Sequence, residues 1–138
     1  MPAASVSAEV ARLRARARGA DTGDDVVRAL VRLGSAHPTD AEIPLLLGEI
    51  YCQRLWVNDC LDAFRRAIRI APALRDDGRL LRAVMYGLGN DGHHARIRRF
   101  LVDDIGPAAV PYLEEVVAGR WRKEVKSRAS ATLAELRP

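Results

Sequence analysis

Apolar residues recur along the chain at the three- and four-residue spacing of helices that bury one face. Clear examples are Cys60, Phe64 and Ala67 in one segment and Val125 and Ala129 in another. This periodicity predicts an all-α fold of about eight antiparallel helices. The predicted helices cover residues 5–19, 23–36, 40–54, 57–70, 76–88, 92–104, 107–118 and 121–136.

Two local signals sharpen the third predicted helix. Thr39 is followed three residues later by Glu42, the capping-box spacing that satisfies free amide groups at a helix start. We therefore expect this helix to begin near residue 40. Gly48 inside it costs about 1 kcal/mol relative to Ala, which is explained if the next helix approaches closely at Cys60 or Phe64.

The chain also matches itself when it is shifted by 34 residues. Leu13 then falls on Leu47 and Ala29 falls on Ala63. This is the length of a helix-turn-helix unit that buries its apolar face by stacking on a neighbour. The alternative is a chance alignment of amphipathic helices.

Leu47, Gly48 and Tyr51 in one predicted helix are followed by Phe64, Ala67 and Pro72 in and after the next. Through these residues, 41–74 resemble a tetratricopeptide (TPR) repeat, and residues 7–40 resemble a degenerate copy of it. The departures are Pro44, where the family most often has a large apolar residue, and Leu55, where a turn glycine is common. Both put the local helix-turn geometry in question but not the helix pairing.

Residues 105–136 resemble a HEAT-type repeat through Val110-Pro111-x-Leu113 and Val125-Lys126-x-x-Ala129-x-x-x-Leu133. Both repeat types are antiparallel helix pairs, so together they imply one α-solenoid over residues 1–138. Its expected hairpins are a degenerate TPR-like pair, a TPR-like pair, a transitional pair and a HEAT-like pair, covering residues 5–38, 39–74, 75–104 and 105–138.

The tandem of repeats also resembles helical regions appended to some bacterial serine/threonine protein kinases. The chain has no Gly-rich phosphate loop and no His-Arg-Asp or Asp-Phe-Gly triplet, so the resemblance implies a signalling module without the kinase. We expect no enzyme activity, catalytic residue or cofactor. His93 and His94 are adjacent, point about 100° apart on a helix, and do not predict a metal site.

Composition limits the core and the partners. The chain has 138 residues, which is about one domain, and only 5% of them are aromatic, so small side chains must let the helices approach closely. A formal charge of +4 permits acidic partners without requiring them. The first residues lack the pattern of a signal peptide, so we expect a cytoplasmic location. We expect Cys52 and Cys60 to be buried, reduced thiols.

The first helix of each stacked pair lines the inner face of such an array, which predicts a groove for an amphipathic helix or an extended segment of a partner protein. The alternative is that Leu45 and Leu46 simply pack against neighbouring helices. The predicted groove residues are Arg12, Glu42, Leu45, Leu46, Glu49, Gln53, Arg79 and Tyr86.

A basic patch near the C-terminus predicts a second kind of partner. Its cations surround Trp121 and are able to neutralise phosphates of nucleic acid or an acidic protein surface. Pairing with nearby glutamates is the alternative, and Trp121 is expected to cover the last hairpin rather than to stack on bases. The patch comprises Arg120, Arg122, Lys123, Lys126 and Arg128.

Overall fold

The computed structural model describes residues 3–17 and 23–137. Throughout these residues the regular secondary structure is helical and no strand is present, so the all-α prediction is confirmed. The last two residues of the predicted helix 5–19 lie outside the described residues. The α-helices are α1 (Ala3–Ala17), α2 (Asp24–Ala36), α3 (Glu42–Gln53), α4 (Val57–Ile70), α5 (Gly78–Met85), α6 (His94–Arg99), α7 (Val110–Ala118) and α8 (Lys123–Leu136).

The second half of the chain is less regular than its periodicity predicts. The predicted helix 76–88 consists of α5 and a following 3₁₀ turn. Helix α5 begins two residues later than predicted, because the Asp77 side chain caps it by accepting hydrogen bonds from the amides of Arg79 and Leu80. The predicted helix 92–104 is α6 followed by a wider π-helical turn. The four turns are 3₁₀ at Pro72–Asp76, Tyr86–Gly89 and Gly106–Ala109, and π at Phe100–Ile105.

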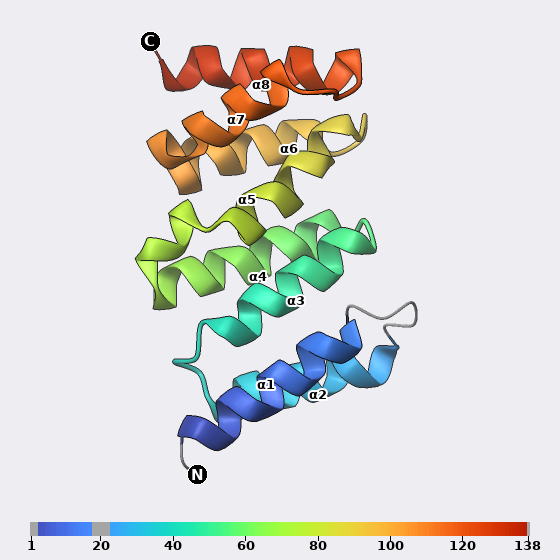
Figure 1. The fold of residues 1–138 in the computed structure, drawn as a ribbon, viewed down its shortest axis with the longest axis vertical. Coiled ribbons are helices and arrows are strands. Elements are labelled where there is room, and N and C mark those ends of the chain that lie inside the picture. Colours follow the sequence, from blue (N-terminus) through green and yellow to red (C-terminus); the bar gives the residue numbers. More distant parts are fainter. Residues whose placement is uncertain (1–2, 18–22, 138) are drawn as a thin grey trace.

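The helices are stacked in order along the longest axis of the molecule, with the two termini at opposite ends (Figure 1). Alternate helices touch one another: α1 contacts α3, α3 contacts α5, and α5 contacts α7. The closest packing between neighbours in the chain is within the pairs α3–α4 and α7–α8. Helix α3 therefore has neighbours on both sides along the stack.

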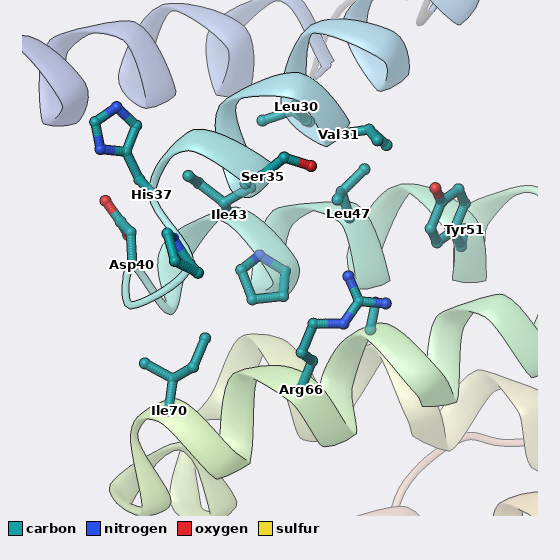
Figure 2. A pocket seen from close by; sticks show the side chains of 14 residues that line it. Leu30, Val31, Ser35, His37, Asp40, Ile43, Leu47, Tyr51, Arg66 and Ile70 are labelled. Carbon is teal, nitrogen blue, oxygen red and sulfur yellow. The ribbon is translucent and has the colours of Figure 1, made fainter.

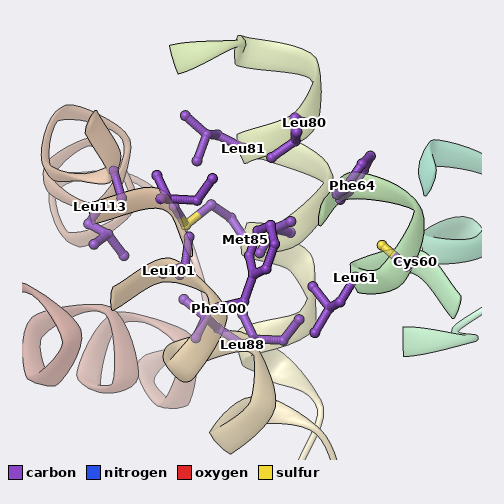
Figure 3. Close-up of a cluster of buried hydrophobic side chains, with 14 of the residues drawn as sticks. Cys60, Leu61, Phe64, Leu80, Leu81, Met85, Leu88, Phe100, Leu101 and Leu113 are labelled. Atoms are coloured by element: carbon purple, nitrogen blue, oxygen red, sulfur yellow. The ribbon is translucent and has the colours of Figure 1, made fainter. Parts of the chain in front are cut away.

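Two clusters of buried side chains form the core, and α3 contributes to both. Ile43, Leu46 and Ile50 belong to the cluster shared with α1 and α2. Leu45 belongs to the larger cluster, which runs from α4 to α8 and contains Phe64 (Figure 3). Because its apolar side chains point both ways along the stack, α3 connects the two clusters.

The α3–α4 pair crosses where the sequence predicts it. A Cβ atom built on Gly48 would lie 2.3 Å from two ring carbons of Phe64, far inside van der Waals contact. Phe64 itself is fully buried. The prediction that the missing side chain lets the partner helix approach is therefore confirmed.

We expect Gly48→Ala to lower the free energy of unfolding by about 1–3 kcal/mol, because the overpacking strain exceeds the gain in helix propensity. Chemical denaturation measures this loss. In a Phe64→Leu background the same change should cost clearly less, since the ring that it meets is gone. Equal losses in both backgrounds would contradict the proposed crossing.

The predicted cap of the third helix is wrong. Thr39 is exposed, and α3 begins at Glu42, two residues later than expected. Asp40 takes the place of Thr39, because its Oδ1 accepts a hydrogen bond of 3.0 Å from the amide of Glu42. The Glu42 side chain is then free to reach neighbouring helices.

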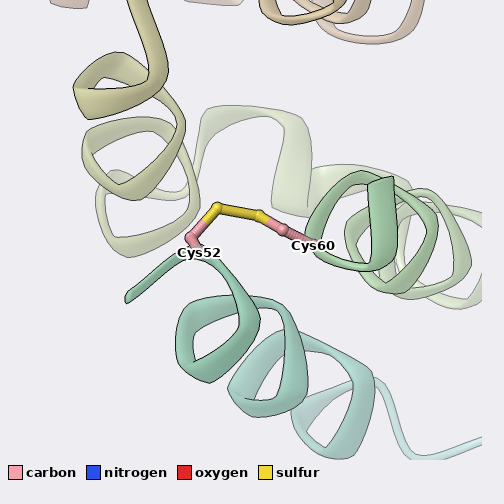
Figure 4. The surroundings of a disulfide bond; sticks show 2 residues. All are labelled: Cys52 and Cys60. Carbon is pink, nitrogen blue, oxygen red and sulfur yellow. A yellow bond between two sulfur atoms is a disulfide. The ribbon is translucent and has the colours of Figure 1, made fainter. Parts of the chain in front are cut away.

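The expectation of reduced thiols is also wrong, because Cys52 and Cys60 form a disulfide (Figure 4). Cys52 is near the end of α3 and Cys60 is in the first turn of α4, and the short connection brings their Cα atoms to 5.2 Å. Leu55 makes that connection with a left-handed backbone (φ 62°), the conformation that glycine adopts most easily. Spacing alone does not reveal this approach.

We expect the disulfide to stabilise the α3–α4 pair. The disulfide closes a loop between cysteines 8 positions apart and so lowers the conformational entropy of the unfolded chain. Cys52→Ser should therefore lower the free energy of unfolding by about 2–3 kcal/mol. Thermal unfolding with and without reductant measures the effect. The Cys52→Ser variant is the control, because reductant should no longer shift its melting temperature.

Candidate functional site

Charged side chains connect the three helices that are predicted to line the groove. Glu42 at the start of α3 forms ion pairs with Arg14 of α1 and with Arg79 of α5, the latter at 3.0 Å. Asp77, just before α5, lies 3.7 Å from the Arg79 guanidinium. The three helices therefore present one continuous charged cluster, made of Arg14, Glu42, Asp77 and Arg79.

The two glutamates of this face have opposite pKa shifts. Partial burial by itself raises the pKa of Glu42, but hydrogen bonds from Arg14 and Arg79 outweigh it and hold the pKa below its ordinary value. Burial raises the pKa of Glu49, and the attraction of Arg79 and Arg14 offsets this only in part. Glu42 is therefore firmly ionised, and Glu49 is more easily protonated.

Unsatisfied atoms remain beside the charged cluster. Glu49 Oε1 and Arg14 Nε are buried and have no hydrogen-bond partner in the part of the chain that the structure describes. A buried polar atom without a partner costs about 1–3 kcal/mol. Glu49, one of the predicted groove residues, thus lies beside the charged cluster with one carboxylate oxygen that accepts no hydrogen bond from the described residues.

The apolar middle predicted for the groove is absent. Leu45 is 0% exposed and Leu46 is 3% exposed, and they pack in the two different core clusters. Of the two interpretations left open by the sequence, packing against neighbouring helices is the one that the structure shows. Arg12 and Gln53 are exposed, and Arg12 pairs with Glu9 on its own helix.

The remaining predicted groove residue, Tyr86, is the most exposed large hydrophobic residue of the described part of the chain, at 71%. It lies against Trp121, with ring centroids 5.0 Å apart. The two rings and Tyr112 border a hollow of about 120 Å³. The guanidinium carbon of Arg82 lies over the Tyr112 ring, 5.7 Å from its centroid. We call this site the aromatic hollow; its lining is Arg82, Met85, Tyr86, Tyr112, Glu115, Val116 and Trp121.

Sequence reasoning singled out Tyr86 and Trp121 but assigned them to different sites, and it missed Tyr112 and Arg82. The available signal was the scarcity of aromatic residues: of the three tyrosines and two tryptophans in the chain, two tyrosines and one tryptophan line this hollow. Trp121 is half-buried and packs against the core cluster, in agreement with its predicted role as a cover for the last hairpin.

The predicted basic patch is divided by the fold. Arg128 turns inward, donating to the Leu88 carbonyl at 2.7 Å and pairing with Asp91 at 2.6 Å. Arg122 donates to the Gly89 carbonyl at 3.3 Å. Within the described residues, the other three cations, Arg120, Lys123 and Lys126, have no ion-pair or hydrogen-bond partner.

No family model, curated protein or solved structure matches this chain. Among the residues that the structure describes, no cluster of three or more His, Cys, Asp or Glu side chains is arranged to hold a metal ion. None of the described helices is both long and apolar enough to cross a membrane.

The opposite pKa shifts predict opposite effects of neutralising the two glutamates. The raised pKa of Glu49 means that its charged form destabilises the fold at neutral pH, and that this cost disappears as the carboxyl is protonated in acid. We expect Glu49→Gln to raise the free energy of unfolding at pH 7 by up to about 1 kcal/mol. Near pH 4 the change should be small.

Glu42→Gln is the matched comparison on the same helix. The lowered pKa of Glu42 means that its stabilisation is present above the ordinary pKa and is lost as pH falls through the folded-state pKa. The variant should be less stable at pH 7 by about 0.5–1 kcal/mol, since the ion pairs are half-exposed. Denaturation of both variants at several pH values checks these signs, and equal shifts would contradict them.

Proposed function

We propose that the chain is a TPR/HEAT-like α-solenoid that binds a segment of another protein without catalysing a reaction. The contacts between alternate helices support this proposal, because stacked helix pairs place their first helices side by side. The proposed repeats are the TPR-like unit at 41–74, its degenerate copy at 7–40 and the HEAT-like unit at 105–136.

The exposure of Tyr86 beside Trp121 is the observation that carries the binding proposal. Tyr, Trp and Arg are the side chains that most often dominate the energy of protein interfaces, and they do so in small pockets that exclude water. The aromatic hollow combines all three types. A partner that inserts an apolar side chain from an amphipathic helix or an extended segment fits this chemistry.

The charged cluster extends the proposed interface along the stack. Glu42 and Arg79 are each partly exposed, so they offer both signs of charge to a partner that crosses α3 and α5. Such charges select partners and speed association more than they add affinity. The tandem of repeats resembles helical regions appended to some bacterial serine/threonine protein kinases. A regulatory role in a signalling system is therefore part of this proposal.

The proposed location is the cytoplasm, and the Cys52–Cys60 disulfide weighs against it. Reducing compartments keep most thiols free, whereas disulfides persist in oxidising ones. Trapping of free thiols in intact cells tests the location directly. Two free thiols per chain would favour the cytoplasm.

We expect Tyr86→Ala to weaken capture of the partner at least about tenfold, because truncation empties an interface anchor. Affinity capture followed by mass spectrometry identifies the partner, and titration with the purified partner measures the loss. The matched control is Trp56→Ala, which removes another exposed aromatic residue, on the α3–α4 connection. Equal weakening by both variants, or none by Tyr86→Ala, would contradict the proposed interface.

A second candidate function is binding of nucleic acid or an acidic protein surface. Arg120, Lys123 and Lys126 favour it because they have no charged partner among the described residues. Contacts to phosphates weaken steeply as salt rises, so such a partner should be lost between about 0.1 and 0.5 M salt. A partner anchored in the aromatic hollow should stay bound.

A further inference from the structure

A second concave site lies away from the aromatic hollow, between α2, α3 and α4 (Figure 2). Its volume is about 320 Å³, within the range of about 300–1,000 Å³ that is usual for small-molecule sites. Its accessible apolar surface comes from Val31, Tyr51 and Ile70, whereas Leu30, Ile43 and Leu47 also line it but are almost fully buried. We call it the α2–α4 cavity.

Small side chains explain why the α2–α4 cavity is not filled. Ala63 of α4 and Pro44 of α3 line it with little side-chain bulk, and a Cβ atom on Gly34 of α2 would meet Ile43 at 3.2 Å. Val31 borders the same space and is 47% exposed, which is unusual for a large apolar side chain in this protein. The cavity is thus an apolar space that the chain's own side chains do not occupy.

One cation lines this apolar space. The guanidinium of Arg66 extends from α4 toward Leu47 and Tyr51 of α3 (Figure 2). Among the described residues Arg66 makes no hydrogen bond or ion pair, whereas its neighbour Arg65 pairs with both Asp62 and Asp104. Arg66 therefore has all its donors available beside the cavity.

The other charged groups of the cavity lie away from Arg66. Asp40 is the only carboxylate among the described residues of the lining, and its Oδ1 already accepts the hydrogen bond from the Glu42 amide. Asp40 and His37 lie at the opposite end from Arg66 (Figure 2). The end of the cavity at Arg66 is therefore suited to an anion.

We propose that the α2–α4 cavity binds a small aliphatic carboxylate. The hydrocarbon chain lies against Val31, Tyr51 and Ile70, and the carboxylate accepts hydrogen bonds from Arg66. Arginine matches the two oxygens of a carboxylate with parallel donors, and such charge-assisted bonds are stronger than neutral ones. This site uses other residues than the proposed protein interface, so either can fail without the other.

Titration of the whole protein with octanoate, followed by methyl NMR and calorimetry, tests the proposal. Octanoate should bind saturably, shift the methyl signals of Val31 and Ile70, and bind about tenfold or more tightly than 1-octanol of the same chain length. The neutral alcohol separates recognition of the carboxylate from simple apolar burial. Tyr86→Ala should leave octanoate binding unchanged.

Arg66→Gln should reduce the affinity for octanoate to that for 1-octanol. The matched control is Arg69→Gln, which removes another exposed arginine of α4 that does not line the cavity and should leave binding unchanged. Val31→Trp, at an exposed position on the border, should weaken both ligands by occupying the space. Circular dichroism and the unfolding midpoint establish that each variant is folded.

Three results would overturn the proposal. Equal affinities for octanoate and 1-octanol would leave an apolar cavity without recognition of an anion. Equal losses in Arg66→Gln and Arg69→Gln would assign binding to general positive charge. Shifts centred on the aromatic hollow, or no saturation at all, would place no carboxylate site between α2 and α4.

Discussion

The contact between Gly48 and Phe64 is the constraint on which the rest of the structure depends. The ring of Phe64 occupies the place of a side chain on α3, which brings α3 and α4 together more closely than any larger residue permits. That approach lets α3 contribute side chains to both core clusters. The same two helices are joined by the disulfide, and other residues of both line the α2–α4 cavity. In a core with few aromatic residues, the packing of one aromatic ring against one glycine thus determines how closely α3 and α4 approach.

Arginine side chains connect helices that are not neighbours in the sequence. Glu42 is paired with arginines from α1 and α5, and Arg128 of α8 reaches back to Leu88 and Asp91. Each of these contacts joins segments far apart in the sequence. The planar guanidinium suits this role, because it donates several hydrogen bonds at once and covers apolar surface with its stem. These arginines are therefore structural, while the side chains of Arg66 and Arg120 have no such partner in the described residues.

Two sites of different chemistry result from the same stack of helices. The aromatic hollow exposes rigid rings that suit a protein partner, whereas the α2–α4 cavity combines an apolar lining with one unpaired guanidinium. They lie at the junctions of different helices and share no residue. Their proposed ligands are accordingly independent of each other.

The sequence by itself determined the helical class, the approximate helix bounds and the crossing at Gly48, because all three follow from local periodicity and from one residue without a side chain. Only the tertiary structure decided which polar and aromatic residues meet. Leu45 and Leu46 are buried because α3 has neighbours on two sides, and Tyr112 joins Tyr86 and Trp121 because α7 packs on α5. The disulfide likewise depends on the turn through Leu55, which the spacing of the two cysteines in the sequence does not predict. Such meetings are set by the path of the chain in space, which periodicity along one helix does not encode.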